Sequence, residues 1–89
     1  MSSSQKKNIT LSQKELKYFQ KQFGSKVKET REGLELSQLD IASRLNVEKT
    51  SISRIENGRV NFTLSTAAKL AKVLEVELSS LFDFPSKYE

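Results

Sequence analysis

The apolar residues of this chain recur at helical spacing from its first third onward. Between residues 16 and 27 they lie three or four positions apart, at Leu16, Phe19, Phe23 and Val27. This spacing places them on one face of a helix. Ser12 and Glu15 stand ahead of that face in a capping-box pattern. The pattern predicts a helix that runs to about Glu32, although Gly24 weakens its middle and the segment could instead form two helices.

A second apolar pattern begins near residue 36 and predicts a short helix. Ser37 and Asp40 repeat the capping pattern, with Asp where Glu is usual, and Leu36 is placed to pack onto Ile41 as a hydrophobic staple. The side chains expected to face inward from this helix are Leu39, Ala42 and Leu45.

A tight turn and a third helix are predicted to follow. Asn46 is one of the few residues other than glycine that tolerates a left-handed backbone. Val47 is expected to fill the core after this turn. The next helix is predicted over residues 49–57, with Gly58 as its left-handed stop.

The last third of the chain predicts two more helices. Thr63 is a suitable N-cap for a helix whose inward face is expected to carry Leu64, Ala67, Ala68, Leu70, Ala71 and Leu74. A short fifth helix is indicated by Val76, Leu78, Leu81 and Phe82. Pro85 ends the ordered part, and no segment alternates as a strand would. The expected fold class is therefore all-α with five helices.

The composition narrows the classes of function. A chain of 89 residues bounds one domain, and its small core favours a dimer that buries further apolar surface. Cysteine and histidine are absent, which excludes disulfides, Cys/His zinc sites and catalysis by either residue. No metal, cofactor or small-molecule ligand is expected. The polar start lacks a signal-peptide core, and no apolar run approaches the roughly 20 residues of a membrane span, so we expect no membrane partner and a cytoplasmic protein.

The net charge of +4 is unevenly distributed. Residues 1–30 carry seven Lys against Glu15 and Glu29, a balance of +5, whereas residues 31–89 carry eight basic and nine acidic residues, a balance of −1. The basic N-terminal segment could lie near phosphates, or it could be a solvated helix face. The net charge alone does not decide between a segment near phosphates and a solvated helix face.

The stretch from residue 37 to residue 58 is the most informative of the chain. It reads as two short helices joined by a tight turn, the layout of a helix-turn-helix whose second helix enters the DNA major groove. At 100° per residue, Ile52 and Ile55 share the inward face. The opposite, polar face carries Thr50, Ser53, Arg54 and Asn57, with Lys49 on its edge. Lysine and arginine there can donate to guanine O6 and N7, and threonine can touch a thymine methyl group.

These residues resemble the lambda/434 repressor and Cro family of helix-turn-helix regulators, the xenobiotic-response-element type. The resemblance covers residues 23–84 and rests on Leu36-Ser37-Gln38, Ile41-Ala42, Leu45-Asn46-Val47, Ile52-Ser53-Arg54-Ile55-Glu56-Asn57-Gly58 and Leu70-Ala71-Lys72-Val73-Leu74. It implies a five-helix lambda-repressor-like domain. Residues 1–22 would then be a basic extension, partly mobile and partly helical, and residues 85–89 a short tail.

The resemblance also implies roles for single residues. Gln38, Asn57 and Arg59 match positions that hold the DNA backbone, with a backbone N–H at the start of the second helix sharing a phosphate with Gln38. Arg31 is expected to pair with Glu56 and so to tie the first helix to the recognition helix. The chain departs from the family at Glu48, Phe62, Asn46 and Gly33, where Ser or Thr, Pro, Gly and a later Gly are more usual; Glu48 leaves open which bases are read.

The function that follows is a sequence-specific transcriptional regulator. It is expected to bind double-stranded DNA at a two-fold operator as a homodimer, with restriction–modification controllers and phage-type repressors as candidate subtypes. The apolar cluster at residues 73–84 could be core or dimer face. The alternative is a protein-interaction adaptor or an antitoxin that docks onto a protein partner. Hydroxyl side chains such as Thr50 have no activating base beside them in sequence, so an enzyme is not expected.

Overall fold

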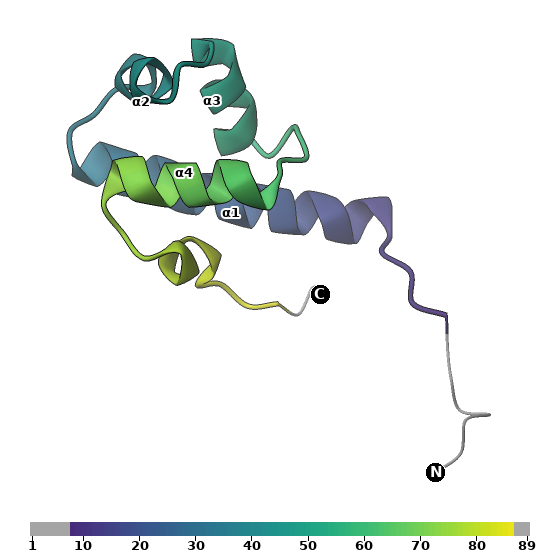
Figure 1. Cartoon of the computed structure of the whole chain (residues 1–89). Helices are drawn as coiled ribbons and strands as arrows, with labels where there is room; N and C mark the ends of the chain where they lie inside the picture. The colour runs from purple at the N-terminus through teal and green to yellow at the C-terminus, as the bar shows by residue number, and fades with distance from the viewer. Residues whose placement is uncertain (1–7, 87–89) are drawn as a thin grey trace.

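The structure, a computed structural model, describes residues 8–86. Within that range every secondary-structure element is a helix, which confirms the all-α class. The fifth helix is 3-10 rather than α-helical, so the expected count of five α-helices is slightly wrong. The elements are α1 (Gln13–Gly33), α2 (Gln38–Leu45), α3 (Lys49–Glu56), α4 (Leu64–Leu74) and the 3-10 helix η2 (Leu78–Phe82) (Figure 1). The mobility expected at the start of the chain concerns mainly residues outside the described range.

The long helix α1 is the support on which the other elements rest. It contacts α3, α4 and η2, while α2 packs between α3 and α4. In Figure 1 the α2–α3 pair lies on one side of the α1–α4 pair, and η2 lies on the other. α1 starts with the expected capping box, since the Glu15 N–H donates to Ser12 Oγ at 3.0 Å and the Ser12 N–H to Glu15 Oε1 at 2.9 Å. No described helix is long and apolar enough to cross a membrane.

Gly24 lies inside one continuous helix and does not divide α1 into two. A Cβ at this position would lie 2.3 Å from the Ile55 carbonyl oxygen and 2.5 Å from that of Glu56. Glycine is therefore required here because the backbone of α1 touches the last turn of α3. The predicted boundary between an extension and the domain, at residues 22 and 23, also falls within this unbroken helix.

The helix-turn-helix forms at the expected place. Ser37 and Asp40 cap α2 reciprocally, Asn46 ends it in the left-handed region at φ 59°, and Gly58 follows α3 at φ 67°. Two expectations about its interior are wrong. Leu39 is 58% exposed and Val47 45% exposed, so neither is a core residue.

The inward faces of α2 and α4 are narrower than their apolar sequences indicate. In α2 the contact face centres on Ile41 and Ala42, and Leu39 points roughly 110° away from the centre of that face. In α4 the buried residues are Ala67, Leu70, Ala71 and Leu74. Leu64 is 71% exposed at the first helical position, and Ala68 is exposed as well. The inward placement expected for these two residues is wrong.

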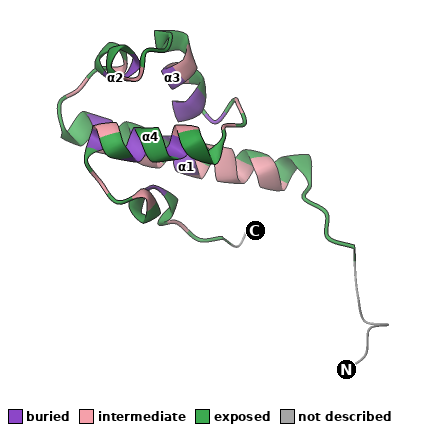
Figure 2. Cartoon of the chain, in the orientation of Figure 1, coloured by how far each residue is buried: buried purple, intermediate pink, exposed green. Residues whose placement is uncertain are grey.

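The core lies where the five helices meet, and α2 contributes Ile41 and Ala42 to it (Figure 2). Each of its fully buried large side chains contributes roughly 1.5–3 kcal/mol relative to an exposed one. They are Phe23, Val27, Ile41, Ile52, Leu70, Leu74 and Leu81.

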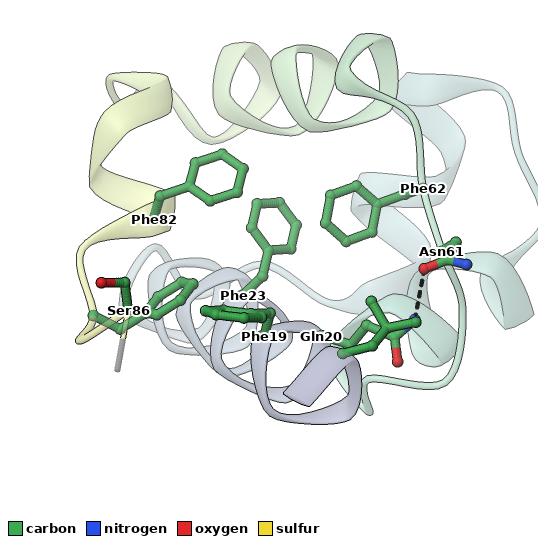
Figure 3. Close-up of a pocket in the computed structure, with 9 residues that line it drawn as sticks. Phe19, Gln20, Phe23, Asn61, Phe62, Phe82 and Ser86 are labelled. Carbon is green, nitrogen blue, oxygen red and sulfur yellow. Dashed lines mark hydrogen bonds between the residues drawn. The ribbon is translucent and has the colours of Figure 1, made fainter. Parts of the chain in front are cut away.

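An aromatic cluster joins the first half of α1 to the C-terminal segment (Figure 3). Phe23 stacks on Phe62 with ring centroids 4.3 Å apart and meets Phe82 at 4.9 Å. The Phe62 that departs from the family pattern thus has a packing role. Tyr18 adds a hydrogen bond from its hydroxyl to the Pro85 carbonyl at 2.7 Å. An apolar cavity of about 380 Å³ remains between these rings. Residues 13–22 therefore pack on their own chain.

Candidate nucleic-acid interface

The outer face of α3 is polar and open. Ile52 and Ile55 are buried and hold the helix to the core, so the opposite side turns to solvent. Lys49, Thr50 and Arg54 are exposed on that side. Within residues 8–86 their side chains make no hydrogen bond or ion pair, so their donors remain available to a ligand.

A buried ion pair fixes α3 against α1. Arg31 Nε donates to Glu56 Oε2 at 2.6 Å, and a second guanidinium nitrogen donates to Oε1 at 3.0 Å. The side chains are 9% and 1% exposed. The Arg31–Glu56 pair expected from the sequence is therefore present, in the bidentate geometry that an arginine fork favours.

Two further contacts make this pair a link among three elements. Arg31 also donates to the Leu36 carbonyl at 2.8 Å, just before α2, and Gln38 Nε2 donates to Glu56 Oε1 at 2.9 Å. The hydrogen bonds to the Glu56 carboxylate raise the pKa of the Arg31 guanidinium, although burial opposes this shift. The described part of the chain has no buried side-chain nitrogen or oxygen without a partner. The start of α2 and the end of α3 are thus fixed by one carboxylate.

The side chain of Gln38 is consequently fixed by a hydrogen bond to another residue of the protein. Its amide nitrogen has two N–H groups, and the bond to Glu56 uses one of them. The other remains for a DNA phosphate, so the structure leaves the expected role of Gln38 a prediction.

The start of α2 also carries a negative charge. The Ser37 backbone N–H and side-chain hydroxyl both interact with the Asp40 carboxyl group, and these hydrogen bonds lower the pKa of that group. The Ser37 N–H to Asp40 Oδ2 distance is 2.8 Å. An ionised carboxylate at this position stabilises the helix N-terminus.

The remaining predicted residues cluster at the end of α3. Asn57 donates to the Ser53 carbonyl at 2.8 Å and to Ser53 Oγ at 3.3 Å, so its side chain closes the last turn of the helix. Ser53 is half-buried, whereas Asn57 and Arg59 are exposed. The N-cap residue of α3 is Glu48, whose side chain makes no capping bond.

Two lysines that sequence reasoning did not single out lie beside this cluster. Lys17 donates from Nζ to the Gly58 carbonyl at 2.9 Å. Lys21 lies so close to Gly58 that a Cβ there would be 2.7 Å from Lys21 Cγ. Together they line a polar hollow with Asn57 and Arg59. Their spacing of four residues was the available signal, but only the fold shows which part of the chain they face.

Comparison with known proteins gives a consistent picture. The HTH_3 helix-turn-helix family model matches residues 27–81, more than half of the chain. The control protein C.MunI from Mycoplasma sp is 39% identical over 61 residues, which are 67% of this chain and 82% of that protein. An HTH-type transcriptional regulator from Archaeoglobus fulgidus is 30% identical over 60 residues, 67% of this chain and 84% of that protein.

A solved structure shows the same fold. The restriction-modification controller protein C.AhdI from Aeromonas hydrophila superposes with a TM-score of 0.67 at 31% identity. The superposition covers 70% of this chain and 94% of that protein. The family model begins at residue 27, so the first half of α1 lies outside the residues that it matches.

Proposed function

This chain belongs to the HTH_3 helix-turn-helix family of Cro/C1-type regulators, as the sequence predicted, and from that premise we propose that it binds a two-fold DNA operator as a homodimer. The relatives named above are a control protein and an HTH-type transcriptional regulator, which supports a regulator rather than an enzyme. In this proposal residues 23–84 form the DNA-binding domain and residues 1–22 a basic extension. The protein acts in the cytoplasm.

The observation that carries the proposal is the open outer face of α3. Lys49, Thr50 and Arg54 have free side chains on a helix that Ile52 and Ile55 anchor in the core. A recognition helix in the major groove needs this combination of a fixed inner face and unpaired outer donors. Each good bidentate contact to a base discriminates by roughly 1–3 kcal/mol. Gln38, Ser53, Asn57 and Arg59 flank this face and are proposed to set its register on the DNA backbone.

The subtype we favour is a controller of a restriction–modification operon. C.AhdI is a restriction-modification controller protein and C.MunI a control protein, and the match spans most of each. The proposal includes two copies related by a two-fold axis, and because such a dimer reads a palindromic operator, the half-sites lie about one helical turn apart.

The dimer face is proposed to include the exposed part of the C-terminal cluster. Phe82 is 44% exposed, whereas Leu81 is fully buried. Phe82→Asp should therefore give monomers by analytical ultracentrifugation while the fold persists. Leu81→Asp would unfold the core and cannot test the interface. A dimer that survives Phe82→Asp places the interface elsewhere.

The proposed function is tested by selecting binding sites from a random DNA library at about 0.15 M salt. Enrichment of a palindrome is the expected result. Lys49→Ala and Arg54→Ala should then relax the sequence preference at single base pairs, whereas Arg59→Ala should weaken binding to all sequences alike. If no sequence is enriched and the Arg54→Ala and Gln38→Ala variants retain biological function, the protein is an adaptor that docks onto a protein partner.

A further inference from the structure

Four of the five lysines of α1 form a single exposed stripe. At 100° per residue, these four lie within an arc of roughly 60° on one side of the helix. The apolar face of α1 points away from this arc, and all four residues are exposed. They are Lys14, Lys17, Lys21 and Lys28. Lys14, Lys17 and Lys21 precede residues 27–81, the part of the chain that the family model matches.

The stripe runs directly past the end of the recognition helix. The Lys17–Gly58 hydrogen bond and the contact between Lys21 and Gly58 join α1 to the residues just after α3. Gly58 permits this approach, since it has a left-handed backbone and no side chain to meet Lys21. The lysine stripe and the Asn57–Arg59 segment therefore form one continuous surface.

A hollow of about 540 Å³ lies at this junction. It is lined by three cationic side chains, two neutral polar ones and one carboxylate: Lys17, Lys21, Arg59, Ser25, Asn57 and Glu56. The carboxylate already accepts bonds from Arg31 and Gln38, so its charge is largely compensated. The bond to Gly58 uses one of the three donors of the Lys17 ammonium group, which leaves two for a ligand.

We propose that this hollow holds a DNA backbone phosphate and that the lysine stripe of α1 extends the phosphate-binding surface beyond the helix-turn-helix. The inference rests on the proposed DNA binding, and it assigns Lys17 and Lys21 of α1 as groups that bind a DNA phosphate. A merely solvated lysine face has no reason to converge with Arg59 and Asn57. Here the fold directs Lys17 and Lys21 to the same hollow as the residues that follow the recognition helix. The stripe reads no bases, so it contributes affinity and salt dependence rather than sequence preference.

The test compares the salt dependence of DNA binding between charge-matched variants. Each phosphate contact contributes about 0.9 to the slope of log affinity against log salt. Because both lysines serve one phosphate, Lys17→Gln with Lys21→Gln should lower the slope by about 1 per protomer and weaken binding roughly 5-fold near 0.15 M salt, equally for operator and unrelated DNA. Lys26→Gln with Lys72→Gln removes the same charge from the far side of α1 and from α4, and should leave the slope nearly unchanged.

Two further variants separate phosphate binding from a structural effect of the Lys17–Gly58 bond. Lys17→Arg with Lys21→Arg keeps the charge and should keep the slope. Lys28→Gln, whose side chain has no hydrogen bond within the described residues, should lower the slope without changing the melting temperature. An unchanged slope in the Lys17→Gln, Lys21→Gln protein would overturn the inference while DNA binding stands. Wild-type protein that binds no DNA would instead reject the proposed function itself.

Discussion

At the scale of single residues, glycines set the distance between α1 and α3. Gly24 faces the carbonyl oxygens of Ile55 and Glu56, and Gly58 faces Lys21. From the sequence, Gly24 indicated a weak point in a helix, because glycine is poor at helix formation. The close approach became visible only once the partner helix was in place. Sequence alone could not show it, because Gly24 and Glu56 are far apart along the chain.

Gly24→Ala should destabilise the protein by about 1–3 kcal/mol, because the new methyl group would press on backbone atoms that cannot move independently. Intrinsic helix propensity predicts the opposite sign, a gain of about 1 kcal/mol. Gly33→Ala is the matched control, since nothing lies within 4 Å of a Cβ at that position. It should be neutral or stabilise by up to about 1 kcal/mol. Urea unfolding measures the free energy of unfolding of both variants. Equal values for the two would contradict the packing role of Gly24.

At the scale of elements, the N-terminus of α3 lacks a stabilising side-chain cap. Glu48 has the extended backbone of an N-cap but makes no capping bond. Glu48→Asp should stabilise the protein by about 1 kcal/mol, because the shorter carboxylate reaches the N–H groups of the first turn. Glu48→Gln removes the charge without adding a cap. It should leave the melting temperature nearly unchanged but strengthen DNA binding, since one negative charge near the phosphates is gone. If the melting temperature rose for Glu48→Gln but not for Glu48→Asp, the missing cap would not be what limits the stability of α3.

The capping box of α2 predicts a pH dependence. The pKa of Asp40 is lowered by its hydrogen bonds to Ser37. Because the folded pKa lies below the unfolded one, the stabilising contribution is fully present above about pH 4 and is lost as the pH falls through the folded value. Unfolding free energies of wild type and Asp40→Asn should therefore converge as the pH falls below about 4. Curves that stay parallel would show that the bond does not favour the ionised carboxylate.

The elements also show what sequence patterns can and cannot predict here. Capping residues were sufficient to place the starts of α1, α2 and α4, because the signal is local. Apolar identity was insufficient at Leu39, Val47 and Leu64, because a short helix buries only the side that meets its neighbours. The left-handed Glu35 and Glu75, at φ 60° and 59°, carry no sequence signal, since glutamate rarely adopts this conformation.

At the scale of the whole molecule, the Arg31–Glu56 pair joins α1, α2 and α3 and was predictable only through the family resemblance. The pattern of residues gives no reason to pair positions that are 25 residues apart. The lysine stripe shows the reverse case, because its helical spacing is visible in the sequence while its position beside Arg59 requires the fold.

This arrangement predicts that the pair positions the recognition helix more than it stabilises the fold. Arg31→Met or Glu56→Leu alone should cost about 3–5 kcal/mol, because each leaves a buried charge without its partner. The double variant should lose less than either single one, because apolar side chains replace the pair without leaving a buried charge. Denaturant unfolding of the four proteins closes this double-mutant cycle.

DNA binding by the double variant then separates positioning from stability. α1 carries the lysine stripe and the proposed base-reading face lies on α3, and the ion pair joins the two helices. We expect the double variant to lose affinity for its operator while affinity for unrelated DNA and the salt slope change little, since no phosphate contact is removed. This pattern is the converse of that expected for Lys17→Gln with Lys21→Gln. A double variant that binds its operator as wild type does would show that core packing around Phe23 and Ile55 holds α3 in place without the ion pair.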